Sequence, residues 1–201
     1  MQGAKEKFAR DWKLVKRARF NAAKRYEHKN DASILAFAVA GMAGFLVPVY
    51  TLIFKDDLTA HLKNALDFSS YVTGAMSLIL GLVEQAKEHS EKSRRFDLCG
   101  RQVNSVLRKL NTTSITSEDD LKRLVGEYER ALEKCVENHD DIDYELAKAQ
   151  QAVEDARDEE TKKQALKSLR WTKWQRAVQT YWLYAFIWLS PLVFGIFLWL
   201  V

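Results

Sequence analysis

Three uncharged apolar runs alternate with strongly charged stretches along the chain. The first run covers Ile34–Phe54 and the last covers Tyr181–Val201, and each holds 21 residues without a charge. As a helix, a run of this length extends roughly 31 Å, close to the hydrocarbon thickness of a bilayer. A soluble core helix of this length would usually carry a polar stripe, so both runs are predicted to span a membrane.

The second run, Phe68–Val83, is shorter, and hydroxyl side chains dilute its first half, so whether it spans completely stays open. Its flanks favour a span. Residues 1–33 carry ten Lys or Arg against four Asp or Glu, and further basic residues follow the run at Lys87, Lys92, Arg94 and Arg95. Basic residues on both flanks predict a hairpin with a cytoplasmic N-terminus. The third span would then end outside.

The residues between the second and third runs are predicted to be cytoplasmic helices. One apolar seam steps by three and four through Phe96, Cys99, Val103, Val106 and Leu110. A second seam continues in the same way through Leu121, Val125, Tyr128, Leu132, Cys135, His139, Ile142 and Leu146. Such heptad spacing predicts helices that bury a narrow stripe on partners. Ser117, three residues before Asp120, resembles a capping box, and the charged stretch Glu154–Lys163 is predicted to end a helix or to turn between antiparallel helices.

The predicted fold is therefore all-α, as a membrane helical protein. It comprises a basic cytoplasmic N-terminal helix (1–33), a transmembrane hairpin (34–83, with spans 34–54 and 68–83), a cytoplasmic helical or coiled-coil bundle (84–180) and a C-terminal transmembrane helix (181–201). The N-terminal helix either lies on the anionic inner leaflet or packs on the cytoplasmic helices. Arg19 interrupts its apolar face and favours packing.

No catalytic residue, metal site or cofactor is predicted. The four histidines are scattered, and no metal-ligand spacing, phosphate-binding Gly-rich loop or nucleophile elbow occurs in the sequence. These absences argue against an enzyme. Cys99 and Cys135 both fall in apolar seams and are interpreted as small buried hydrophobes that stay reduced.

Two rows of small residues lie inside the predicted hairpin. Ala36, Ala40 and Gly44 form a small-xxx-small row that lets another helix approach closely. On the second span, one face carries Ser70, Gly74, Ser77, Gly81 and Glu84. This face either lines a narrow aqueous path in an oligomer or packs against the other spans, and the packing interpretation is favoured.

Two segments resemble a known family. The run from Trp12 to Asn30 has the basic residues and Arg-x-Asn-Ala pattern that begin SLATT domains, the SMODS- and SLOG-associating two-transmembrane effectors of bacteria. The segment Glu137–Tyr144 resembles their Asn-His-x-x-x-Asp-Tyr segment. The matching positions are Lys16, Arg17, Arg19, Asn21, Ala22, Arg25, Asn138, His139, Asp143 and Tyr144. The resemblance covers roughly residues 8–150, so the third span is expected to be a subfamily addition.

His139 has two interpretations. As a polar residue of the seam it would set helix register or bond to Asp143 or Tyr144, which is favoured; otherwise it would sense pH or contact a ligand. The segment Asn138–Tyr144 is alternatively a capped helix break.

The resemblance implies an antiphage or conflict-system effector in the bacterial inner membrane. Such proteins are expected to form homo-oligomeric pores that depolarise or permeabilise the bilayer when a cytosolic sensor, such as a nucleotidyltransferase or reverse transcriptase system, triggers them. A nucleotide or nucleic-acid signal is compatible with this. Two other classes stay open: a non-pore scaffold that recruits a cytosolic partner, and a receptor that binds a nucleotide signal.

Overall fold

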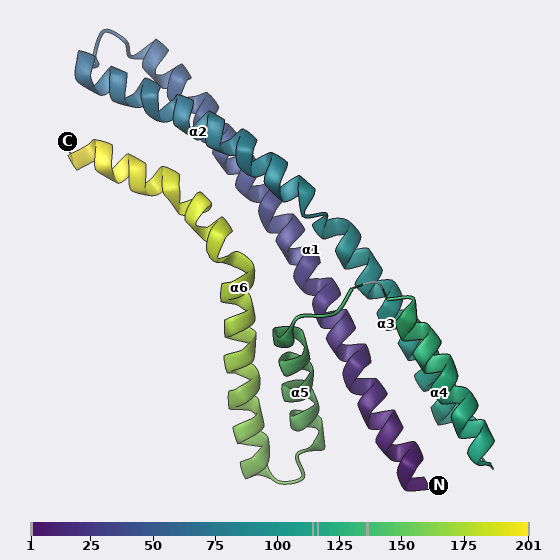
Figure 1. Cartoon of the computed structure of the whole chain (residues 1–201). Coiled ribbons are helices and arrows are strands. Elements are labelled where there is room, and N and C mark those ends of the chain that lie inside the picture. The colour runs from purple at the N-terminus through teal and green to yellow at the C-terminus, as the bar shows by residue number, and fades with distance from the viewer. Residues whose placement is uncertain (1, 114, 116, 136, 201) are drawn as a thin grey trace. The chain divides into compact units, whose positions relative to one another are not determined.

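In the computed structural model, the residues described form six helices and no strand. The structure describes residues 2–113, 115, 117–135 and 137–200, with side chains as far as Leu189. The helices, labelled in Figure 1, are α1 (Gln2–Ile53), α2 (Ala60–Ala86), α3 (His89–Thr112), α4 (Glu118–Glu133), α5 (Asp141–Asp155) and α6 (Glu159–Leu200). The all-α prediction is confirmed.

The chain divides into two compact units. The first, here called the charged unit, contains Met1–Glu27 and Ser90–Gln179. The second, the apolar unit, contains His28–His89 and Thr180–Val201. Because α1 and α6 each run without a break past these boundaries, both helices contribute to both units.

The charged unit has its largest apolar core where the start of α1 packs on α3 and α4. Trp12 is 3% exposed, and its ring stacks on Tyr128 with centroids 4.5 Å apart. Around it lie buried aliphatic side chains from α3 and α4, namely Val106, Leu107, Leu110, Leu121 and Leu124. All five residues of the first predicted seam are buried. The N-terminal helix therefore packs on the helices of its own unit, as its interrupted apolar face predicts.

The second predicted seam is not one helix. The capping box at Ser117 and Asp120 starts α4 as predicted, but α4 ends at Glu133 and α5 begins only at Asp141. Cys135 and His139 therefore lie between helices, so the alternative of a helix break is confirmed, although the Asp140 side chain at the start of α5 makes no capping hydrogen bond. The physical reason is that Asp141 and Asp143 fill the first turn of α5, where carboxylates favour a helix N-terminus over a helix interior.

The apolar unit contains the hairpin of α1 and α2, which lie side by side in Figure 1. Two helical stretches, Gln2–Ile53 and Ala60–Thr112, are long and apolar enough to cross a membrane, and only 17% and 11% of their most apolar windows are buried within the protein. Large side chains such as Phe45 and Leu78 point outward, 67% and 74% exposed. A soluble core helix would hide such residues, so this surface requires lipid. The protein is a membrane helical protein.

The predicted third span forms the last part of α6. Helix α5 ends at Asp155 and α6 runs unbroken from Glu159 to Leu200, so a break between helices falls within the charged stretch Glu154–Lys163, as predicted. The side chains from residue 190 onward lie outside the described part of the chain. Tyr181–Val201 therefore stays a predicted span.

A backbone break separates α2 from α3. Glu88 has a φ of 50°, in the left-handed region that residues with a Cβ rarely adopt. It follows Lys87, the C-cap of α2, at the position where many helices end in glycine. This break coincides with the passage of the chain from the apolar unit to the charged unit.

Candidate functional site

The two family-motif segments meet in the charged unit at a buried ion pair. Arg25 of α1 is 2% exposed and Asp143 of α5 is fully buried. The Arg25 guanidinium donates from Nε to both carboxylate oxygens at 3.2 and 3.1 Å, and from Nη2 to Oδ2 at 2.9 Å. Asp140 adds a second carboxylate 2.7 Å from Nη2. Although burial alone would lower the pKa of Arg25, the hydrogen bonds and charge of Asp143 raise it, so the guanidinium stays charged.

Asn21 and Arg176 extend this pair into a network that joins three helices. Asn21 Nδ2 donates to the backbone carbonyl of Asp143 at 3.2 Å and to Gln150 Oε1 at 3.3 Å. Arg176 of α6 donates to the backbone carbonyl of Asn21 at 2.8 Å and lies 4.0 Å from Asp143 Oδ1. Ala22, fully buried beside Phe96, lets α1 approach α3 closely. A buried pair with this many partners fixes the register of the helices; it offers no free group for catalysis.

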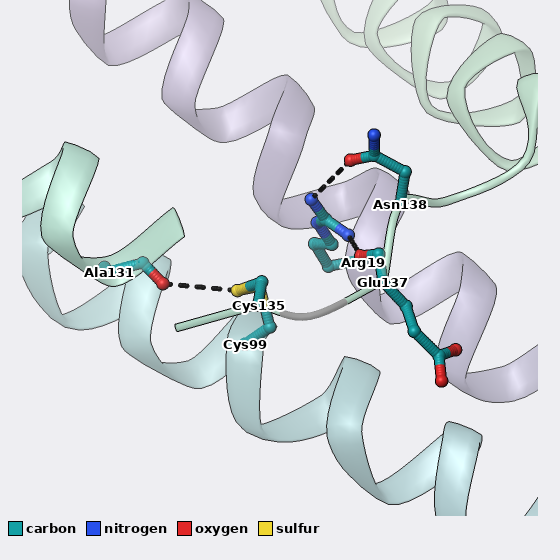
Figure 2. Close-up of a disulfide and its surroundings, with 6 residues drawn as sticks. All are labelled: Arg19, Cys99, Ala131, Cys135, Glu137 and Asn138. Carbon is teal, nitrogen blue, oxygen red and sulfur yellow. Dashed lines mark hydrogen bonds between the residues drawn. A yellow bond between two sulfur atoms is a disulfide. The ribbon is translucent and has the colours of Figure 1, made fainter. Parts of the chain in front are cut away.

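Arg19 clamps the connection between α4 and α5, as Figure 2 shows. Its guanidinium donates to the backbone carbonyl of Glu137 and, at 3.4 Å, to Asn138 Oδ1. Arg19 is 4% exposed, and its charge lies over the Phe96 ring at 5.7 Å. The apolar face of the N-terminal helix is therefore interrupted at a position where a buried cation is needed.

The remaining motif residues lie at the edges of this network. His139 packs its ring 5.7 Å from that of Tyr144, and burial followed by the charge of Arg19 lowers the pKa of His139. The imidazole is therefore neutral near pH 7. Arg17 pairs with Glu154 at the end of α5, and together with Lys13 it lowers the pKa of Glu154 to about 2.

The structure contradicts the interpretation of the cysteines as reduced thiols. Cys99 of α3 and Cys135, just after α4, form a disulfide with their Cα atoms 5.7 Å apart. The pair is 36 residues apart in sequence, and the seam pattern placed Cys135 inside a helix that does not exist there. Sequence reasoning also missed Gln150 and Arg176, because single polar residues on charged helices carry no signal of burial.

In the apolar unit, the predicted face of α2 packs on α1. Ser70 is 7% exposed and donates from Oγ to the backbone carbonyl of Gly44 at 3.2 Å. Pro48, four residues after Gly44, has no N–H, so that carbonyl lacks its usual helical donor. In a bilayer a hydroxyl from a neighbouring helix is the kind of group that can replace it. Ser70 therefore supplies a missing backbone partner.

Small residues of the two helices lie along the same contact, at distances that would still accept a Cβ. The position of a Cβ on Gly44 would lie 4.0 Å from the Gly74 nitrogen, and one on Gly81 would lie 3.6 Å from the Phe37 ring. Ser77 donates within its own helix, to the Thr73 carbonyl. Of the small-xxx-small row on α1, Ala36 is 1% exposed and packs with Tyr184 of α6, while Ala40 and Gly44 are half-buried.

Glu84 ends this face as a buried carboxylate with three partners. It is 6% exposed, and it accepts a hydrogen bond from the Tyr184 hydroxyl of α6. His89 Nε2 lies 3.1 Å from Glu84 Oε2, and Lys87 pairs with Oε1. Burial lowers the pKa of His89, although the carboxylate opposes this effect. The C-terminal helix is thus joined to the hairpin through one acidic side chain.

An open groove runs from Glu84 along the hairpin. It measures about 570 Å³ and is mainly apolar, with Phe37, Leu78 and Leu82 along its walls and Glu84 and His89 at its polar end. Among the residues that the structure describes, no three His, Cys, Asp or Glu side chains are placed to hold a metal ion. The chemistry available here is hydrogen bonding and charge pairing.

The comparison with protein families gives one match. SMODS and SLOG-associating 2TM effector domain family 5 matches residues 1–197. The match reaches beyond the expected residues 8–150 and includes most of α6, so the C-terminal helix lies within the family's own extent. No curated protein and no solved structure matches the chain.

The family's name describes an effector with two transmembrane segments that associates with SMODS and SLOG proteins. Such effectors are linked to antiphage conflict systems, and SLATT effector domains are not known as enzymes. The two apolar helical stretches of the described chain agree in number with that name. The chain therefore belongs to the SLATT proteins, as a member of SMODS and SLOG-associating 2TM effector domain family 5.

Proposed function

We propose that copies of this protein assemble in the bacterial inner membrane and form or gate a pore. The pore depolarises or permeabilises the membrane when a cytosolic sensor, from a nucleotidyltransferase or reverse transcriptase system, triggers it. In this proposal the N-terminus and the charged unit are cytoplasmic, and the C-terminal helix crosses to the outside. The signal is a bound partner, a nucleotide or a nucleic acid.

A single hairpin has no aqueous lining of its own. Its outward surface is built from side chains such as Phe68 and Leu82, about 70% exposed, whereas Ser70 and Glu84 are buried. Conduction requires polar groups around a shared axis. Several copies must therefore associate, and the polar face of α2 must leave its contact with α1.

The buried carboxylate of Glu84 is the observation that carries this proposal. Burying an acidic side chain at the edge of a membrane span is costly. Such residues usually pair with another polar group and often have a functional role. One of the three partners of Glu84 is the hydroxyl of Tyr184, which joins the carboxylate to α6. We infer that this contact is a latch of the closed state.

Opening is then a shift between two states. A trigger can shift this equilibrium only if it binds the open and closed states with different affinity. Helices α1 and α6 each run from the charged unit into the apolar unit. A rearrangement of the charged unit can therefore break the contact between Glu84 and Tyr184 in the apolar unit.

Tyr184→Phe tests the latch, because it removes only the hydroxyl. We expect cells that express this variant to depolarise without the neighbouring sensor gene, as measured with a voltage-sensitive dye. Trp182→Phe is the matched control, since Trp182 lies on the same helix and is 65% exposed. Wild-type protein should depolarise cells only when the sensor is present.

Two outcomes would count against the proposal. Equal dye signals from Tyr184→Phe, Trp182→Phe and wild type would exclude the latch. Wild-type protein that binds its sensor partner but never depolarises the cell, and that stays monomeric in detergent, would favour the membrane scaffold or receptor instead.

A further inference from the structure

The disulfide lies at the start of the segment that holds α1. Cys135 comes directly after α4, and Glu137 and Asn138 follow it with the two groups that accept hydrogen bonds from Arg19. Figure 2 shows how close the sulfur pair and this clamp are. Because the bond fixes Cys135 to α3, it restricts the chain on which the Arg19 clamp depends.

The two cysteines border a small cleft. It measures about 140 Å³ and is also lined by Arg95, Lys134 and Glu137. Cys99 is 4% exposed, whereas Cys135 is half-buried. An attacking thiolate would therefore meet Cys135, and Cys99 would leave. Arg95 is already paired with Glu91 and Glu137, so Lys134 is the cation of the cleft that can favour the thiolates formed in the exchange.

The same site also suits the reduced pair. Cys135 Sγ lies 3.2 Å from the Ala131 carbonyl oxygen, a contact in which a thiol can donate a hydrogen bond and a disulfide sulfur cannot. Cys99 lies in the apolar seam of α3, where a thiol is a small hydrophobe. A reduced Cys135 would therefore have an acceptor for its thiol hydrogen, and a reduced Cys99 would lie among apolar side chains.

We propose that Cys99 and Cys135 form a reversible redox site that takes thiol reductants as its substrate class. A reductant thiolate attacks Cys135 Sγ and forms a mixed disulfide, while Cys99 leaves as a thiolate and takes a proton. A second reductant thiol then attacks the mixed disulfide. The products are two protein thiols and one reductant disulfide, and an oxidised thiol compound drives the reverse reaction.

The location of the site supports a regulatory use. Disulfides in the bacterial cytosol are usually transient or redox-sensing, and the proposed topology puts the charged unit there. The oxidised pair would pin the α4–α5 connection on Arg19, and the reduced pair would release it. Only this regulatory use rests on the proposed function; the exchange chemistry does not.

Thiol trapping of the purified full chain tests the exchange. The protein in detergent is equilibrated with mixtures of reduced and oxidised glutathione, and free thiols are counted by the gel shift of a polymer-linked maleimide. We expect both thiols to appear and disappear together and reversibly without denaturant. A pair that resists reduction until the protein is unfolded, or that never oxidises when folded, would overturn the proposal.

Hydrogen exchange tests the release of the clamp. On reduction, we expect the backbone amides of residues 137–140 to exchange roughly tenfold faster or more, while the amides of α2 stay unchanged. Cys135→Ala should show the fast exchange in both reducing and oxidising buffer. If the amides of residues 137–140 exchange at the same rate in the oxidised and the reduced wild type, the disulfide does not restrict this segment.

These measurements involve no conductance. A failed trapping experiment leaves the pore proposal untouched, and a protein that makes no pore can still pass both tests.

Discussion

The two units differ most in the kind of side chain that they expose. In the charged unit, Leu110 and Leu146 are almost fully buried, and the surface carries ion pairs such as Arg101–Asp97. In the apolar unit, large hydrophobic residues such as Phe45 are exposed, and Ser70 and Glu84 are buried. Apolar burial drives folding in water, but it supplies no force between helices that are already in lipid. The apolar unit therefore depends on close backbone approach and on pairing its few polar groups.

Arg25→Met should have the largest effect, because it leaves Asp143 buried without its partner. Breaking such a pair costs about 3–5 kcal/mol of unfolding free energy. Chemical denaturation followed by circular dichroism would measure the loss. Lys24→Met is the matched control, since Lys24 is the exposed neighbour on the same helix.

The double variant Arg25→Met with Asp143→Leu should recover much of that loss, because it removes both charges. If Arg25→Met behaves like Lys24→Met, the buried pair does not hold the charged unit together.

Ser70→Ala should be the next largest change, and it probes the apolar unit. It leaves the Gly44 carbonyl without a donor, at a cost of about 1–3 kcal/mol in unfolding free energy. Ser69→Ala is the control, since Ser69 donates only within its own helix. Unfolding in detergent micelles would compare the two variants.

Pro48→Ala should rescue Ser70→Ala, because it restores the backbone N–H for the Gly44 carbonyl. Additive losses in this double-mutant cycle would show that Ser70 and Pro48 are not coupled through that carbonyl.

His139→Gln should have a smaller effect that is confined to acidic pH. Burial and then Arg19 lower the pKa of His139 in the folded protein, so the unfolded chain binds the proton first as the pH falls. The contribution of neutral His139 to stability is therefore full above its usual pKa of about 6.5 and is lost below it. Denaturation midpoints measured between about pH 8 and pH 5, the range in which histidine titrates, should fall less steeply in the variant as the pH is lowered.

His61→Gln, at an exposed position of α2, is the control. His89 keeps its own contribution to the slope, since burial lowers its pKa as well. If the denaturation midpoint of His139→Gln depends on pH as steeply as that of the wild type, folding does not lower the pKa of His139.

Glu88→Gly should give the smallest change, a stabilisation below about 1 kcal/mol, because glycine adopts the left-handed conformation without strain. Gln85→Gly in the last turn of α2 should instead destabilise the protein, by less than the roughly 1 kcal/mol that glycine costs in a helix interior. Melting temperatures of the two variants would then move in opposite directions. A loss of stability in Glu88→Gly would show that the break at Glu88 is not strained.

Local patterns in the sequence predicted several elements well. The length and lack of charge of Ile34–Phe54 predicted a helix made for lipid, and the spacing from Phe96 to Leu110 predicted a buried stripe. Ser117 predicted the start of α4 through its capping box. The same periodicity failed after Glu133, because a heptad pattern does not register that acidic residues are starting a new helix.

The sequence by itself determined where most of the helices lie and that the first two apolar runs are suited to lipid, because length, period and charge are local properties. Only the tertiary structure decided the partners: Arg25 with Asp143, Ser70 with the Gly44 carbonyl, and Cys99 with Cys135. Burial of a polar or sulfur-containing side chain is favourable only when a complementary group arrives at the same place, and in these three pairs that group is 118, 26 and 36 residues away. A local sequence pattern does not predict which distant residues will form such a pair.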